Sequence, residues 1–202
     1  IASVHLDYIR YCDIYLPENL QKYYKLNQNY EMPEFDFGYH PNGRLKFKNA
    51  HGIDPIDIND EDYAKKWKQF RLDAITKLVN ELKLIASDNQ TRLSAAVFPY
   101  PEMSSKMVLQ DWSNWNLDII CPMNYHNFYN GDINWIGNSV SQGIKYKKST
   151  GKYLSGLFIG ALDGNKLQSA ITESLNNGAD GVCIFNLEYL NDDYLKILKS
   201  FT

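Results

Sequence analysis

The stretch that decides the predicted fold is Ile1-Ala-Ser-Val-His5-Leu-Asp7-Tyr-Ile-Arg10-Tyr11. Its apolar residues Val4, Leu6 and Tyr8 alternate with Ser3, His5 and Asp7. Alternation with a period of two is typical of a strand with one face toward a core and one polar face. We therefore predict a β-strand over residues 3–10. Active sites of parallel α/β proteins lie at the carboxyl ends of the strands, where this strand places Asp7.

The pattern of a strand followed by a helix runs through the chain five times. Further strands are predicted at 92–99, 118–125, 153–161 and 181–186, and helices near 60–87, 103–112, 134–147, 165–177 and 192–201. In the helix near 60–87, apolar residues recur at helical spacing, as at Trp67, Phe70, Ala74 and Leu78. This alternation predicts an α/β fold with a parallel sheet and right-handed crossovers.

Five such units fit either an open doubly wound sheet or part of an eight-unit TIM-type barrel, which typically needs about 250 residues. No glycine-rich phosphate-binding turn follows the first strand, as an open nucleotide-binding sheet usually requires. Polar side chains instead follow nearly every strand: Asp7, Arg10, Tyr100, Asn124, Tyr125, His126, Asp163 and Glu188. Groups that converge from many strand ends favour the barrel.

The connection from residue 11 to about 59 is too long and too aromatic for an ordinary loop. It includes Tyr15, Tyr23, Tyr24, Tyr39 and Phe47, whereas disordered linkers are poor in aromatic residues. We expect it to fold over the strand ends as a lid or as one wall of a cleft. The alternative is a packed insertion without a ligand role.

Composition fits a single globular domain over residues 1–202, because 202 residues with 44% apolar content can bury a full core. The net charge of −3 argues against a nucleic-acid partner, because no excess of Lys and Arg is available for phosphates. No apolar run approaches the roughly 20 residues of a transmembrane helix. The three cysteines indicate no disulfide framework. We expect Cys121 and Cys183 to be small buried hydrophobes and Cys12 to be more exposed.

Several segments together resemble a known family. His5-Leu-Asp-Tyr-Ile-Arg-Tyr11 resembles the fourth-strand signature of the glycosyl-hydrolase-like family 10 proteins and related glycosidase barrels. The segment Trp67-Lys-Gln-Phe-Arg71 resembles their following helix, and Leu93-Ser-Ala-Ala-Val-Phe-Pro99 their fifth strand. Residues 117–125, Leu-Asp-Ile-Ile-Cys-Pro-Met-Asn-Tyr, are similar to their sixth strand.

The resemblance implies that this chain supplies the last five units of a TIM-barrel glycosidase. The missing amino-terminal part of the barrel would then be its partner. It further implies hydrolysis of a poly- or oligosaccharide without cofactor or metal, at an extracellular, periplasmic or cell-surface location. Chitinase-like family 18 barrels are more distantly similar, through Met123-Asn-Tyr-His126. Their strand-four signature would place the acid at Ile9, and only Asp7 of its four acidic positions is present.

Glycoside hydrolysis needs two carboxyl groups across the scissile bond. Asp7 is the first candidate, with a buried structural aspartate paired with Arg10 as the alternative. Glu188 is the second candidate, unless it is a surface residue that opens a turn. Glu31, Glu34 and Asp36 of the long connection are weaker candidates.

The predicted substrate-binding residues are Arg10, Tyr100, Asn124, Tyr125, His126 and Asp163. The alternative for Asn124, Tyr125 and His126 is a satisfied polar group at a strand end, and for Asp163 an ordinary turn. A metal site of His5, Asp7 and His126 is disfavoured, because metal-dependent hydrolases usually show tighter ligand spacing. Two functions outside glycoside hydrolysis stay open: a non-catalytic carbohydrate-binding barrel and an open five-stranded α/β binding domain.

Overall fold

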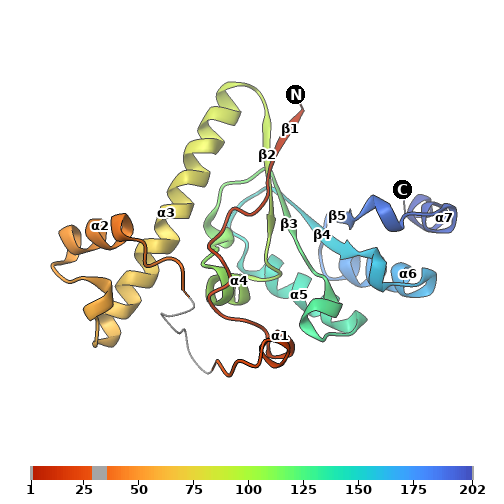
Figure 1. Cartoon of the computed structure of the whole chain (residues 1–202). Coiled ribbons are helices and arrows are strands. Elements are labelled where there is room, and N and C mark those ends of the chain that lie inside the picture. Colours follow the sequence, from red (N-terminus) through yellow and green to blue (C-terminus); the bar gives the residue numbers. More distant parts are fainter. Residues whose placement is uncertain (1, 29–35, 202) are drawn as a thin grey trace.

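The computed structural model describes residues 2–28 and 36–201. Five strands form one sheet: β1 Ser3–Leu6, β2 Arg92–Val97, β3 Ile119–Pro122, β4 Lys152–Phe158 and β5 Gly181–Phe185. Each strand lies parallel to the next one along the chain, in the order β1-β2-β3-β4-β5 (Figure 1). The predicted α/β fold with five parallel strands is confirmed.

Helices separate the strands along the chain. After β1 come α1 Glu18–Tyr23, α2 Pro41–His51 and the long α3 Glu61–Asp88. The later strands are followed in turn by α4 Pro101–Val108, α5 Ile133–Tyr146, α6 Gly164–Asn176 and α7 Asp192–Lys199. None of the helices in the described ranges combines the length and apolar character needed to cross a bilayer.

The first strand is shorter than predicted. It ends at Leu6, and Tyr8 adopts a φ of 51°, a left-handed conformation uncommon outside glycine. The backbone N–H of Arg10 then donates to the carbonyl of Tyr8 at 2.8 Å. The chain therefore turns out of the sheet directly after Asp7, and the segment from Tyr8 onward is free to line the strand ends.

One face of the sheet is covered by helices. Leu93, Ala95 and Val97 of β2 pack with Val79 and Ala86 of α3 in one buried cluster. A second cluster joins β4 and β5 to the helices α5, α6 and α7 (Figure 1). Right-handed crossovers between strands in consecutive order place their helices on the same face. The strand order thus lacks the reversal that defines a doubly wound sheet.

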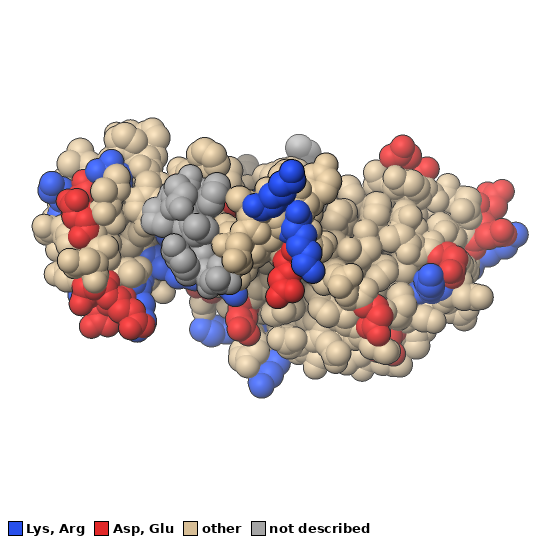
Figure 2. All heavy atoms as spheres, turned by 60° about the horizontal axis from the view of Figure 1, so that its bottom comes forward, with Lys and Arg blue, Asp and Glu red and all other residues tan. Residues whose placement is uncertain are grey.

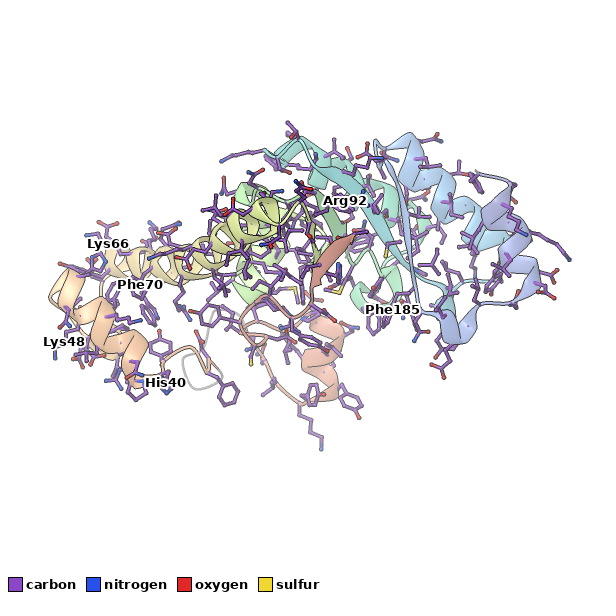
Figure 3. All side chains as sticks on the ribbon, turned by 90° about the horizontal axis from the view of Figure 1, so that it is seen from above. His40, Lys48, Lys66, Phe70, Arg92 and Phe185 are labelled. Atoms are coloured by element: carbon purple, nitrogen blue, oxygen red, sulfur yellow. The ribbon has the colours of Figure 1, made fainter. Side chains whose placement is uncertain are left out.

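The long connection after β1 has two structurally different halves. Near its start, Tyr11 and Ile14 pack against Leu72 and Leu109, beside the strand ends. Farther along, Phe47 of α2 lies with its ring 5.2 Å from that of Trp67 and 5.5 Å from that of Phe70. Helix α2 and the first half of α3 form an arm that extends away from the sheet (Figures 1 and 3). The part of the connection near Tyr11 and Ile14 therefore lies as a wall beside the strand ends, whereas α2 is an insertion packed on α3.

A buried polar network fastens β3 and β4 to the helices. Asn124 is fully buried; its Nδ2 donates to Ser155 Oγ at 2.9 Å, and Ser139 Oγ of α5 donates to its Oδ1 at 2.6 Å. Ser155 Oγ also lies 2.9 Å from Ser174 Oγ of α6. Buried polar groups that are fully paired fix the relative position of the elements that hold them.

We expect Asn124→Ala to lower the free energy of unfolding by about 1–3 kcal/mol, because it removes the acceptor of the buried Ser139 hydroxyl and one of the two partners of Ser155. Urea unfolding followed by circular dichroism measures this loss. Asn138→Ala, at an exposed position of α5, is the matched control and is expected to change stability by less than about 0.5 kcal/mol. Equal losses in the two variants would contradict the network's structural role.

Candidate functional site

A cavity of about 470 Å³ opens on the other face of the sheet, toward the carboxyl ends of the strands. All five strands contribute to its lining, together with the segment that follows β1 and with Pro17 and Leu20 at the start of α1. Figure 2 shows the end of the molecule that faces downward in Figure 1, where charged side chains are few and scattered over the visible surface. A cavity at this position is where parallel α/β proteins bind ligands.

Small side chains form the floor of the cavity. Ala96, Cys121, Gly156 and Cys183 line it from four neighbouring strands. A Cβ atom added to Gly156 would lie 2.6 Å from the carbonyl oxygen of Pro122, so the backbone of β3 approaches too closely for any side chain there. The floor stays open because these residues leave space that larger side chains would fill.

Aromatic side chains form one wall. The rings of Tyr125 and Phe185 are stacked, with centroids 5.4 Å apart and planes 13° from parallel. The ring centroid of Phe128, which also lines the cavity, lies 5.8 Å from that of Tyr125. Phe158 is not part of the lining, but its ring centroid lies 6.1 Å from that of Tyr125 and supports the wall. Phe185 is the last residue of β5, and Figure 3 shows it at the sheet, far from the labelled residues of the α2–α3 arm. Aromatic faces of this kind can pack against the apolar faces of sugar rings.

Two carboxylates line the cavity, Asp7 and Asp13. Asp7 Oδ1 accepts the backbone N–H of Tyr8 at 2.9 Å, and the carboxylate is exposed. Asp13 pairs with Arg10, whose Nη1 donates to Asp13 Oδ1 at 2.9 Å. The Arg10 guanidinium also lies over the Phe98 ring, 5.3 Å from its centroid. Arg10 is therefore paired with Asp13 and not with Asp7, which leaves Asp7 open to a ligand.

His5 also lines the cavity and is tied to the neighbouring strand β2. Ser94 Oγ lies 3.1 Å from the Val4 carbonyl and 2.9 Å from His5 Nδ1. The tautomer of the imidazole decides which of the two atoms, Nδ1 or Oγ, donates in the second contact. The contact itself fixes the orientation of the ring at the cavity.

Two tyrosines of the cavity, Tyr125 and Tyr129, are held in the neutral form. Burial raises the pKa of Tyr125, and the nearby Cys183 and Asp7 add to the rise. Burial likewise raises the pKa of Tyr129, with a smaller contribution from Asp13. Both phenols are hydrogen-bond donors at neutral pH, which suits recognition of hydroxyl-rich ligands.

Three of the predicted site residues come together in the cavity: Asp7, Arg10 and Tyr125. Five others do not line it. Asn124 is buried in the network described above, so its contacts match the alternative of a satisfied polar group. Tyr100 precedes α4 and is partly buried, which raises its pKa. His126 is also partly buried; its Nδ1 has no hydrogen-bond partner and burial lowers its pKa.

The remaining two predicted residues lie on the outer surface. Asp163 is the amino-terminal cap of α6, where its Oδ1 accepts the Lys166 backbone N–H at 2.9 Å. Glu188 is exposed in the short 3₁₀ turn Leu187–Tyr189. Asp36 is buried in an ion pair with Arg71. Glu31 and Glu34 lie outside the described residues.

Asp13 is a cavity residue that the sequence pattern did not indicate, and Cys183 is more exposed than the sequence pattern predicts. Asp13 follows Arg10 by three residues, a spacing at which a turn brings opposite charges together, so its pairing had a local signal. Cys183 was expected to be buried, but it is exposed on the cavity side of β5. Strand alternation puts Val182 and Ile184 on the helix-covered face and turns Cys183 the other way. Cys121 is buried and Cys12 exposed, as expected.

Within the described ranges, no three His, Cys, Asp or Glu side chains are grouped as a metal ion would require. No family model and no curated protein matches the sequence. Among solved structures, the chain is similar to bee venom hyaluronidase, with 12% identity and a TM-score of 0.47. The match covers 79% of this chain and 60% of the hyaluronidase chain, so this chain spans less than two thirds of that protein. The resemblance to glycosyl-hydrolase-like family 10 stays a prediction.

The structure makes a testable distinction between Asp163 and Glu188. Asp163→Ala should lower the melting temperature at pH 7, because it removes the cap of α6. The cap hydrogen bond with Lys166 lowers the pKa of Asp163, so its stabilisation is complete at neutral pH and is lost as the pH falls through that lowered pKa. Thermal unfolding at pH 7 and at about pH 3 should therefore show a smaller difference from the parent chain in acid.

Glu188→Ala is the comparison variant, since no helix cap depends on this exposed side chain. We expect its melting temperature to match that of the parent chain at both pH values. A loss for Asp163→Ala that does not diminish in acid would contradict the assigned role of the carboxylate.

Proposed function

We propose that this chain binds a carbohydrate in the cavity and hydrolyses a glycosidic bond there. The observation that supports this most directly is the position of Asp7, an exposed carboxylate at the end of β1 beside an aromatic wall. Carbohydrate sites combine flat apolar surfaces with polar groups that bind hydroxyls. Tyr125 and Phe185 supply the first here, and Asp7, Arg10 and His5 supply the second.

Two carboxyl groups with different tasks are needed for the reaction. We assign Asp7 to proton exchange with the leaving oxygen, because its carboxylate has no cationic partner among the described residues. Asp13 replaces Glu188 as the second carboxylate, since Asp13 lines the cavity and Glu188 does not. Arg10 Nη1 donates to Asp13 Oδ1 at 2.9 Å, and this contact holds the carboxylate in one orientation beside the cavity.

A non-catalytic carbohydrate-binding function is the second candidate. The Arg10–Asp13 pair supports it, because a carboxylate already bound to a guanidinium has less capacity to act on a substrate. In that case the cavity would still bind sugar through its aromatic wall and Arg10. The two candidates differ in one measurable respect, which is whether a bound polysaccharide is cleaved.

We further propose that the five strands belong to an eight-stranded barrel completed by additional β/α units. Consecutive parallel strands with helices on one face are the arrangement that closes into such a barrel. Apolar side chains are exposed beside both outer strands, with Val4 43% and Phe185 47% exposed. An extracellular, periplasmic or cell-surface location remains a prediction from the family resemblance.

The catalytic proposal predicts that the chain, in its longest native form, releases reducing ends from one member of a polysaccharide panel. Asp7→Asn should lower the rate by about 100-fold or more, because the amide cannot exchange the proton. Asp73→Asn, an exposed carboxylate on α3 outside the cavity, is the matched control and should retain the parent rate.

Binding of the cleaved polysaccharide by Asp7→Asn, measured by calorimetry, separates loss of chemistry from loss of affinity. Equal rates for Asp7→Asn and the parent would rule out the assignment of Asp7. A polysaccharide that is bound but never cleaved would establish the non-catalytic candidate.

If the sheet closes into a barrel, the backbone amides of both edge strands should be protected from hydrogen exchange together. In the 202-residue chain, backbone amides of β1 and β5 should exchange with solvent faster than those of β3, which is paired on both sides. In a longer native chain with the complementary units, exchange at both edges should slow by at least about tenfold. Protection of β1 alone would mean a simple extension of the sheet and would contradict closure.

A further inference from the structure

Two cysteine side chains lie together in the floor of the cavity. Cys121 is on β3 and Cys183 on β5, and both line the cavity. Between them runs β4, where Gly156 pairs with Cys183 and forms a bridge with Met123. Because Gly156 has no side chain, the two thiols can meet across the intervening strand.

The two thiols interact directly and differ in exposure. A hydrogen bond from Cys121 lowers the pKa of Cys183 to about 7, while the same bond raises the pKa of Cys121. Cys121 is buried and Cys183 is exposed to the cavity. The titratable and charged groups that share the cavity with Cys183 are Cys121, His5, Asp7, Tyr8, Arg10, Asp13, Tyr125 and Tyr129. Cys121 therefore acts as the donor, and Cys183 as the thiolate that a solute can reach.

The backbone prevents these cysteines from forming a disulfide with each other. Neighbouring strands are about 4.8 Å apart, so Cα atoms on β3 and β5 are at least about 9 Å apart. A disulfide requires Cα atoms within about 7 Å. Strand β4 would have to leave the sheet before the bond could form. The pair is thus arranged to activate one thiol and not to cross-link.

We propose that Cys183 is a thiolation site, activated by Cys121, at which a low-molecular-weight disulfide forms a stable mixed disulfide inside the cavity. The Cys183 thiolate attacks one sulfur of the disulfide R–S–S–R. The R–S–S–R bond breaks, a bond between Cys183 Sγ and one sulfur forms, and the other sulfur leaves as RS⁻. Cys183 is oxidised and the leaving thiolate is the reduced product, so no other oxidant takes part.

A group attached to Cys183 would fill part of the cavity, because of where this residue lies on β5. Phe185 is two residues after Cys183 on the same side of β5, and its ring is stacked on Tyr125. A group attached to Cys183 therefore lies against the aromatic wall and occupies the floor of the cavity. Displacement by Cys121 would create a disulfide between Cys121 and Cys183, which the spacing of β3 and β5 does not allow, so only an external thiol restores the free site.

The expected rate of thiolation at Cys183 follows from two opposing effects. At pH 7, a thiol with the pKa of Cys183 is about 15 times more ionised than one of pKa about 8.5. Thiolates of lower pKa are weaker nucleophiles, which reduces the rate by about fivefold over that difference. The net expectation is a rate about three times that of a free cysteine, with a rate that levels off above pH 7 to 8.

The experiment treats the folded 202-residue chain with bis(2-hydroxyethyl) disulfide from pH 5 to pH 9 and follows each cysteine by peptide mass. At pH 7, Cys183 should be modified about three times faster than N-acetylcysteine under the same conditions. Cys121→Ala should remove this advantage and move the rise of the pH profile to higher pH. Cys121→Ser keeps a donor and should restore much of the parent profile, and Cys12→Ser should leave it unchanged.

Four outcomes would overturn the proposal. The first is that Cys183 is modified no faster than Cys12, and the second is that folded Cys121→Ala has the same pH profile as the parent chain. The third is that the pH profile of Cys121→Ser is no closer to the parent profile than that of Cys121→Ala. The fourth is that a disulfide forms between Cys121 and Cys183. Far-UV circular dichroism establishes that each variant is folded, and Cys121→Ser provides the test if Cys121→Ala does not fold. The mass readout involves no carbohydrate, so failure of this proposal is distinguishable from failure of the glycosidase proposal.

Discussion

Packing of the helices against a single face of the sheet is the constraint on which the rest of the structure depends. Each parallel strand must be followed by a crossover that returns the chain to the start of the next strand. With strands in consecutive order, the crossover helices gather on one side and bury Leu93, Ala95 and Val97. Within residues 2–28 and 36–201, the opposite side is not covered by a layer of helices, although the start of α1 reaches the cavity there. Small residues on that side, such as Ala96 and Gly156, leave the cavity in which Asp7, Tyr125 and Cys183 meet.

The period of the apolar residues made the fold predictable from the sequence. The alternation in β1 and the helical spacing in α3 each recur at the predicted place. Strand ends were less predictable. Tyr8 leaves the β-region although its residue type favours strands; its N–H donates to Asp7 Oδ1 and its carbonyl accepts from the Arg10 N–H, a local turn that the apolar alternation does not reveal.

The site was predictable only in part, because a position after a strand does not fix the direction of a side chain. Asp7 and Asn124 both follow a strand, yet Asp7 faces the cavity and Asn124 faces the helices. A shift of one residue in a strand reverses the face to which a side chain belongs. Asp13 shows the opposite case, since it lies well past the strand and reaches the cavity through its bond with Arg10.

The α2–α3 arm has a consequence for how the molecule unfolds. Phe47, Trp67 and Phe70 pack among themselves on the arm, apart from the clusters that bury the sheet. Helix α3 is continuous through both regions: its first half packs in the arm's aromatic cluster and, through Leu72, against Ile14 and Leu109, and its second half packs on β2. Segments that rest on few buried contacts open at lower free energy than the central core. The arm is therefore the part of the described chain that unfolds first as the temperature rises and that a protease cleaves first, while the sheet and its cavity are still intact.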